Sequence, residues 1–122
     1  MRDLTQLEVW EGSHRLTLAA HEATTTLPWE EQYGLKSQIR RSCAPVPANI
    51  AEGCGRGTNA DLARFLQIAL GSAGELRYHL LLTHDLPHLN PHAYRRPSGE
   101  VTEIKRMLTS FIETLRAFAD KT

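Results

Sequence analysis

The sequence predicts an all-α protein, an antiparallel up-down-up-down four-helix bundle with a proline-kinked second helix. Apolar residues recur at alternating spacings of about three and four over four long segments, the spacing of one helix face. No segment alternates with period two over enough residues to form a strand. Short connections separate the first three segments, and short loops favour antiparallel neighbours in a helical bundle.

The composition indicates one globular domain that spans residues 1–122. The apolar fraction of 41% and the charged fraction of 23% are ordinary for such a protein. The 14 basic and 14 acidic residues give a formal net charge of zero, whereas a dedicated nucleic-acid binder usually carries a basic excess. Because neither a signal segment nor an apolar run of bilayer length occurs, we expect a cytoplasmic protein that does not enter a membrane.

The charges are unevenly placed along the chain. Residues 1–33 contain two basic and six acidic side chains, and residues 34–57 contain four basic and one acidic. We interpret this pattern as compensation within the bundle or between subunits. Of the two cysteines, Cys43 is expected on an inner helix face, and Cys54 is expected in an exposed loop between glycines.

The first helix is predicted over residues 5–26. Three consecutive threonines lower the helix propensity at its end, and Pro28 stops it. Its inward stripe consists of Val9, Ser13, Leu16, Ala20, Ala23 and Leu27.

The second helix is predicted over residues 31–52, with a kink at Pro45 and Pro47. Each proline removes a backbone donor and crowds the carbonyl group four residues before it. Gly53 is expected to end the helix in a left-handed conformation. The inward residues are Leu35, Ile39, Ser42, Val46 and Ile50.

The polar residues after the kink have structural interpretations. We expect Asn49 to satisfy a carbonyl group that the prolines release, and Glu52 to pair with an arginine. A catalytic role for either would need a partnered nucleophile or a second acid, and this segment contains neither. We therefore expect no enzyme and no catalytic residue.

The third helix is predicted over residues 59–86. Thr58 and Asp61 resemble a capping box at its start. Gly71 and Gly74 in mid-helix indicate the close approach of another helix. The core stripe consists of Leu62, Phe65, Leu66, Ala69, Ala73, Leu76, Leu80 and Thr83.

A second set of apolar residues on this helix lies away from the core stripe. A helix that is apolar on more than one side is usually buried on more than one side. In so small a chain a second subunit is the natural cover, so these residues are the candidate oligomer interface. They are Ile68, Tyr78, Leu81 and Leu82.

The fourth helix is predicted to follow a polar connection over residues 87–99. Ser98 is its candidate N-cap, and its last ordered residue is expected near Ala119. Its core stripe is Val101, Ile104, Leu108, Phe111, Leu115 and Phe118.

Candidate ligand sites are weak in this sequence. The glycine-rich segment 53–57 could hold an anion before a helix start, but a flexible turn explains it more simply. Six histidines invite a metal site, but prolines interrupt the spacing of His84, His88 and His92, and we expect no metal and no cofactor. A basic patch of Arg40, Arg41 and Arg56 could contact nucleic acid or another anion, although a solvated face is the simpler interpretation.

Several motifs carry a family resemblance over residues 7–86. They are Leu7-Glu8-Val9-Trp10 with His14, the segment 33–41 (Tyr-Gly-Leu-Lys-Ser-Gln-Ile-Arg-Arg), the signature Val46 to Gly53 with Pro47, Asn49, Glu52 and Gly53, and the segment 65–76. The sequence resembles the bacterial four-helix-bundle protein family, also called the ribosomal RNA intervening-sequence protein family. This family is in turn similar to the accessory variability protein of diversity-generating retroelements.

The resemblance implies a cytosolic homopentamer whose bundles ring a central channel. For most members of the family no molecular activity is established. Our first hypothesis is therefore a non-enzymatic homo-oligomeric scaffold or interaction module. The alternative is a nucleic-acid-binding accessory factor that contacts RNA, DNA or a reverse transcriptase. The retroelement protein is strongly basic and this chain is neutral, which weighs against the alternative.

Overall fold

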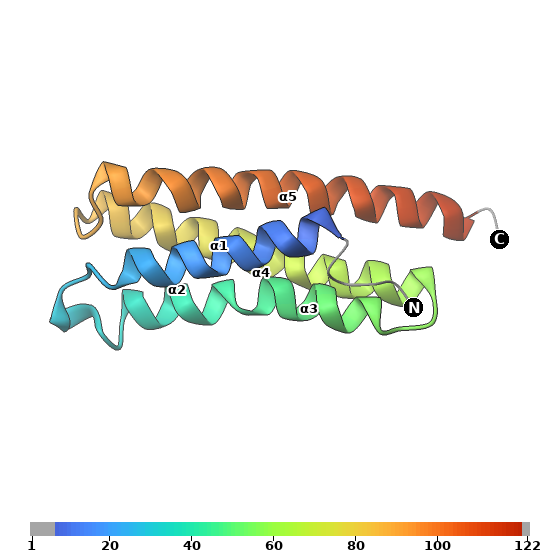
Figure 1. The fold of residues 1–122 in the computed structure, drawn as a ribbon, viewed down its shortest axis with the longest axis horizontal. Coiled ribbons are helices and arrows are strands. Elements are labelled where there is room, and N and C mark those ends of the chain that lie inside the picture. Colours follow the sequence, from blue (N-terminus) through green and yellow to red (C-terminus); the bar gives the residue numbers. More distant parts are fainter. Residues whose placement is uncertain (1–6, 121–122) are drawn as a thin grey trace.

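The computed structural model describes residues 7–120, and these residues form helices and no strand (Figure 1). Four rods lie side by side, one of which consists of two successive helices. The prediction of an all-α helical bundle is confirmed. None of the described helices combines the length and the apolar character that crossing a membrane requires. The elements are α1 (Glu8–Thr24), the 3-10 helix η2 (Trp29–Glu31), α2 (Leu35–Cys43), α3 (Pro45–Cys54), α4 (Asn59–Asp85) and α5 (Pro91–Asp120).

The core lies where the inward stripes of the four rods meet. Helix α4 packs against α5, α3 and α2, and α1 packs against α5, α2 and α3. The stripes predicted for α1 to α4 are buried there, apart from the half-buried Leu27 and Phe65. Burial of such side chains contributes about 1.5–3 kcal/mol each, which is the main stabilisation of the bundle. The largest fully buried apolar side chains are Leu16, Ile39, Val46, Ile50, Leu62, Leu66, Leu76, Leu80, Val101 and Leu108.

The second rod is not one continuous helix over residues 31–52. Helices α2 and α3 meet at Ala44, and Pro45 is the first residue of α3, where a missing backbone N–H leaves no helical bond unmade. Pro47 leaves the carbonyl of Cys43 without its helical donor. The hydroxyl of Thr17 on α1 lies 2.9 Å from Ser13 O in its own helix and 3.3 Å from the Cys43 carbonyl, so its one proton is shared between the two acceptors. The role expected of Asn49 thus belongs to Thr17, because the Asn49 amide donates to Pro45 O at 2.8 Å instead.

Replacement of Thr17 by valine is expected to destabilise the protein by about 1–2 kcal/mol. The isosteric side chain keeps the packing but leaves the Cys43 carbonyl without its donor across the α1–α2 contact. Urea unfolding followed by circular dichroism measures the change. The matched control is Thr102→Val on α5, whose exposed hydroxyl bonds only to Ser98 O within its own helix. Equal effects of the two substitutions would contradict the assigned role of Thr17.

The predictions for Gly53 and Cys54 were wrong, because α3 continues through both residues. No described glycine has a positive φ, so Gly53 is not a left-handed helix stop. A Cβ atom at Gly53 would lie 2.9 Å from Leu62 Cδ1 and 3.0 Å from Phe65 Cβ, so the missing side chain lets α3 approach α4. The Cys54 side chain is buried, with 4% of its surface exposed.

Both cysteines are therefore interior residues. Cys43 is buried as predicted, and this burial raises the pKa of its thiol above the ordinary value. A thiol that stays protonated in an apolar interior is a poor nucleophile. Both cysteines act as small apolar residues of the core.

The start of α4 has the predicted cap, whereas the start of α5 differs from the prediction. The Thr58 hydroxyl accepts a hydrogen bond from the Asp61 N–H at 3.1 Å, as the predicted cap requires. The connection predicted over residues 87–99 is wrong in its second half, because α5 begins at Pro91. Asn90 Oδ1 accepts from Ala93 N at 2.8 Å and caps this helix, in the position assigned to Ser98.

Two further features of α5 differ from the expectation. Pro97 lies inside the helix and is buried, although a proline was expected only in the connection. Phe111 and Phe118 were assigned to the core stripe, but Phe111 is only half-buried and 58% of the Phe118 surface is exposed, whereas Ile112 is buried. The true inner stripe therefore runs through Ile112 to Leu115 and ends there.

Candidate interaction surfaces

The outer face of α4 (Ile68, Gly71, Tyr78, Leu81 and Leu82) carries exposed apolar side chains, with the exposed Arg64 and Glu75 among them. Ile68, Tyr78 and Leu81 expose 44%, 57% and 43% of their surfaces, and Leu82 is half-buried. Nothing lies within 4 Å of the position that a Cβ would take at Gly71. A Cβ at Gly74 would meet only Lys105 Nζ, at 3.8 Å, so the close approach of another helix predicted for these two glycines is not found within the chain.

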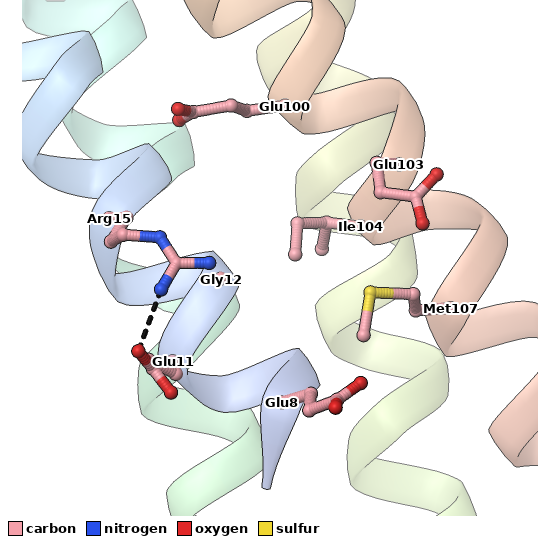
Figure 2. A pocket seen from close by; sticks show the side chains of 8 residues that line it. All are labelled: Glu8, Glu11, Gly12, Arg15, Glu100, Glu103, Ile104 and Met107. Atoms are coloured by element: carbon pink, nitrogen blue, oxygen red, sulfur yellow. Dashed lines mark hydrogen bonds and ion pairs between the residues drawn. The ribbon is translucent and has the colours of Figure 1, made fainter.

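An acidic groove of about 430 Å³ lies between α1 and α5 (Figure 2). A Cβ at Gly12 would lie 2.7 Å from Ile104 Cδ1, so the glycine lets the two helices pack closely at the floor of the groove. Ile104 and Met107 supply apolar side chains, and four carboxylates lie around them (Figure 2). The lining residues are Glu8, Glu11, Gly12, Arg15, Glu100, Glu103, Ile104 and Met107.

Three of the four carboxylates have ion-pair partners in the chain. Arg15 pairs with Glu11 at 2.7 Å. Arg106 donates two hydrogen bonds to Glu103, at 2.5 and 3.1 Å, and these hold the pKa of that exposed carboxyl below its ordinary value. Glu100 accepts from Arg96 Nε at 3.1 Å through Oε1, whereas its Oε2 is buried without a hydrogen-bond partner. With Arg15, Arg96 and Arg106 counted against the four carboxylates, one negative charge is left uncompensated, and Glu8 is the carboxylate without a described ion pair.

A second groove, basic in character, lies on the other side of α5, against the first half of α4. Arg64 and Arg116 line it together with the exposed Ile68, and the Arg64 guanidinium is paired with Asp61, whose Oδ1 lies 3.7 Å from Arg64 Nε. Arg116 Nη2 donates to Gln67 Oε1 at 3.3 Å and thereby joins α5 to α4. The full lining is Asn59, Ala60, Ala63, Arg64, Gln67, Ile68, Leu115 and Arg116.

The three arginines proposed for nucleic-acid contact do not lie together: Arg40 and Arg41 lie on α2, and Arg56 follows the end of α3. Arg40 is half-buried and donates to the Thr24 hydroxyl at 3.0 Å, and the neighbouring Arg41 is exposed. Arg56 lies after α3, about 20 Å further along the rod by helical rise. Glu52 accepts from Arg56 at 2.8 Å, which confirms the expected pairing.

The environments of these arginines also differ. The Arg56 guanidinium lies 4.9 Å from the centre of the Phe65 ring, and that of Arg64 lies 4.5 Å from the same ring. Arg40 instead acts on His21 of α1: burial lowers the pKa of this histidine, and the charge of Arg40 lowers it further. Arg56 is therefore associated with Arg64, not with Arg40 and Arg41.

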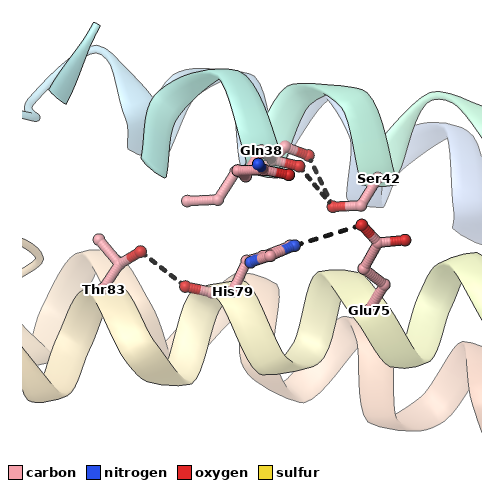
Figure 3. Close-up of polar contacts among 6 residues, drawn as sticks. Gln38, Ser42, Glu75, His79 and Thr83 are labelled. Atoms are coloured by element: carbon pink, nitrogen blue, oxygen red, sulfur yellow. Dashed lines mark hydrogen bonds and ion pairs between the residues drawn. The ribbon is translucent and has the colours of Figure 1, made fainter. Parts of the chain in front are cut away.

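Polar side chains of α2 and α4 face each other around His79, and each makes its hydrogen bonds within its own helix (Figure 3). His79 Nε2 lies 3.3 Å from Glu75 Oε1, and its buried Nδ1 has no hydrogen-bond partner. The Thr83 hydroxyl donates to His79 O at 2.6 Å. The Ser42 hydroxyl donates to the backbone carbonyl of Gln38 at 2.8 Å and is thus not activated by the imidazole. Within residues 7–120 no group of three His, Cys, Asp or Glu side chains is placed to hold a metal ion.

These features define a helical-bundle protein whose distinctive surfaces are one apolar helix face and two oppositely charged grooves. The family model of the 23S rRNA-intervening sequence protein matches residues 5–110, and the chain belongs to this family. The predicted family resemblance is thus confirmed, and the match extends into α5 beyond the motifs that carried it.

A solved structure supports the same assignment. The chain is similar to a protein of unknown function from the S23 ribosomal protein family of Bacteroides thetaiotaomicron. The two chains are 26% identical and superpose with a TM-score of 0.77, over 85% of this chain and 97% of the other. The comparison with curated proteins gives no match.

Proposed function

We propose that the protein is a non-enzymatic, cytoplasmic homo-oligomer, a pentamer as the family resemblance implies, and that it acts as a scaffold or interaction module. The observation that carries the proposal is the outer face of α4, where three large apolar side chains are exposed beside an open glycine. Apolar patches of this kind on a small protein commonly mark interfaces, because their burial removes apolar surface from water.

The proposal includes the antiparallel order of the rods and a bend of the second rod at Pro45 and Pro47. The interruption of the helix at Ala44 and the bond from Thr17 to the Cys43 carbonyl support the bend. Short connections between successive rods support the antiparallel order. In such a bundle the outer face of α4 lies parallel to the rods, an orientation in which a neighbouring helix can pack along it.

Light scattering coupled to gel filtration tests the assembly. The wild-type chain is expected to elute as an oligomer at micromolar concentration. In Tyr78→Glu/Leu81→Glu each new carboxylate would be buried at a contact, which costs about 2 kcal/mol, or roughly 30-fold in affinity, per site. This variant is expected to be a folded monomer.

The matched control places the same charges on an exposed apolar pair elsewhere, Leu18→Glu and Trp29→Glu, and is expected to assemble normally. A wild-type monomer at these concentrations would refute the proposal. Equal loss of assembly in the control would remove α4 as the interface.

The alternative of a nucleic-acid-binding accessory factor has less support. Arg40 is engaged with Thr24, Arg56 is paired with Glu52, and the two lie at different ends of the rod. Among the three arginines, Arg41 is the exposed one for which no side-chain partner is described. A phosphate backbone is bound best by several cations on one continuous surface, so the oligomeric scaffold is the better-supported function.

A further inference from the structure

The two grooves that flank α5 differ in the sign of their charge and have similar volumes, about 430 Å³ and 440 Å³. The acidic groove carries four carboxylates and one arginine around Ile104 and Met107. The basic groove carries Arg64 and Arg116 without a carboxylate, and the exposed Ile68 belongs both to it and to the outer face of α4. Ion pairs with Arg15, Arg96 and Arg106 compensate three of the four carboxylates, and Asp61 compensates Arg64, so each groove keeps one uncompensated charge, negative in the first and positive in the second.

We infer that the acidic groove of one copy receives the Ile68 side chain and the basic groove of the next copy. The contact rests on the proposed oligomeric function and identifies its second, previously unassigned surface. Ile68 packs on the half-buried Met107, and the cations Arg64 and Arg116 face Glu8 and Glu11 across the contact. Both grooves lie on the surface of the single chain, so the bundle does not need to rearrange for this contact to form.

A contact between two different surfaces is a head-to-tail contact. In a two-fold dimer built on the basic groove, like charges of the two copies would face each other, which disfavours that arrangement. A head-to-tail contact repeats from copy to copy and closes into a ring when the rotation per copy allows it. The acidic α1 and the basic surface of α4 lie on separate sides of the bundle, since each packs against α5 and against the second rod.

The charge balance of the chain fits this arrangement. A formal net charge of zero, from 14 basic and 14 acidic residues, hides two local excesses of opposite sign. Opposed excesses on one chain steer successive copies into one register and repel the alternative pairings. The occupant of each groove is therefore a second copy of this chain.

Reciprocal charge reversal tests the contact in the full-length chain. Glu8→Arg/Glu11→Arg makes both grooves basic, and Arg64→Glu/Arg116→Glu makes both acidic. Each variant alone is expected to associate at least roughly tenfold more weakly than wild type, as measured by light scattering over a concentration series. A chain with all four substitutions has the charges exchanged between the grooves and is expected to regain assembly.

Two further samples complete the design. An equimolar mixture of the two double variants is expected to form mixed assemblies, because each supplies the surface that the other lacks. The control Glu30→Arg/Glu113→Arg changes the net charge by the same amount as Glu8→Arg/Glu11→Arg, at exposed positions outside both grooves. It is expected to assemble like wild type. Circular dichroism and urea unfolding verify that every variant is folded.

The outcomes separate this contact from the proposed function. If the wild type assembles and the double variants assemble equally well, the pairing of the grooves is overturned and the oligomer stands. If the double variants dissociate and the fourfold variant stays dissociated, the pairing is likewise overturned, because charge exchange should restore it. A monomeric wild type overturns the oligomer and the contact together.

Discussion

Replacement of Gly53 by valine is expected to cost about 3 kcal/mol of folding free energy. A Cβ at this position would stand 2.9 Å from Leu62 Cδ1, 3.0 Å from Phe65 Cβ and 3.4 Å from Leu62 O, all on α4. The Leu62 side chain can rotate away, but the Phe65 Cβ and the Leu62 carbonyl move only with the backbone. The two methyl groups of valine enlarge the overlap, and overpacking of this kind costs about 1–3 kcal/mol, occasionally more.

The matched control is Gly99→Val, which makes the same change inside α5. Nothing lies within 4 Å of the position of a Cβ at Gly99, so the substitution only removes a flexible residue from a helix. It is expected to be neutral or slightly stabilising, by about 0.5 kcal/mol. Urea unfolding is compared at one protein concentration, because the stability of an oligomer depends on concentration. Equal midpoints for the two variants would show that α3 and α4 do not approach closely at Gly53.

The sequence predicted α4 well because the evidence for it is local. The Thr58 cap, the eight-residue core stripe and the second apolar face all follow from helical spacing. Exposure of Ile68, Tyr78 and Leu81 on the single chain agrees with that spacing. That another copy covers this face stays a prediction.

The start of α5 was misread because its prolines were treated only as helix breakers. A proline is well accommodated at the first position of a helix, after a capping Asn, and Asn90-Pro91 is such a pair. Gly53 was misread for a similar reason. A glycine near a helix end indicates either a left-handed turn or a close contact, and only the position of α4 decides between them.

The acidic groove could be predicted only in part. The sequence shows that the first helix is acidic, and the pairs Glu8 with Glu11 and Glu100 with Glu103 each lie one turn apart. These pairs are separated by most of the chain, and their meeting depends on the packing of α1 against α5.

Leu66→Ala is expected to destabilise the bundle by about 3 kcal/mol, a large part of the 5–15 kcal/mol typical of a native protein. Leu66 is fully buried on α4, the helix that packs against α5, α3 and α2. Truncation removes its burial and leaves a cavity. The surrounding helices can fill this cavity only in part, because each is held by its other contacts.

The control Leu18→Ala makes the same chemical change on α1, where 58% of the leucine surface is exposed. Its expected effect lies within about 0.5 kcal/mol, because little apolar surface returns to water and no cavity forms. The difference between the two urea midpoints, at an unchanged slope, measures the contribution of the Leu66 site to the core. If Leu66→Ala unfolded at the same urea concentration as Leu18→Ala, α4 would not be the centre of the bundle. The packing that sets both the outer face of α4 and the flanks of α5 would then have to be different.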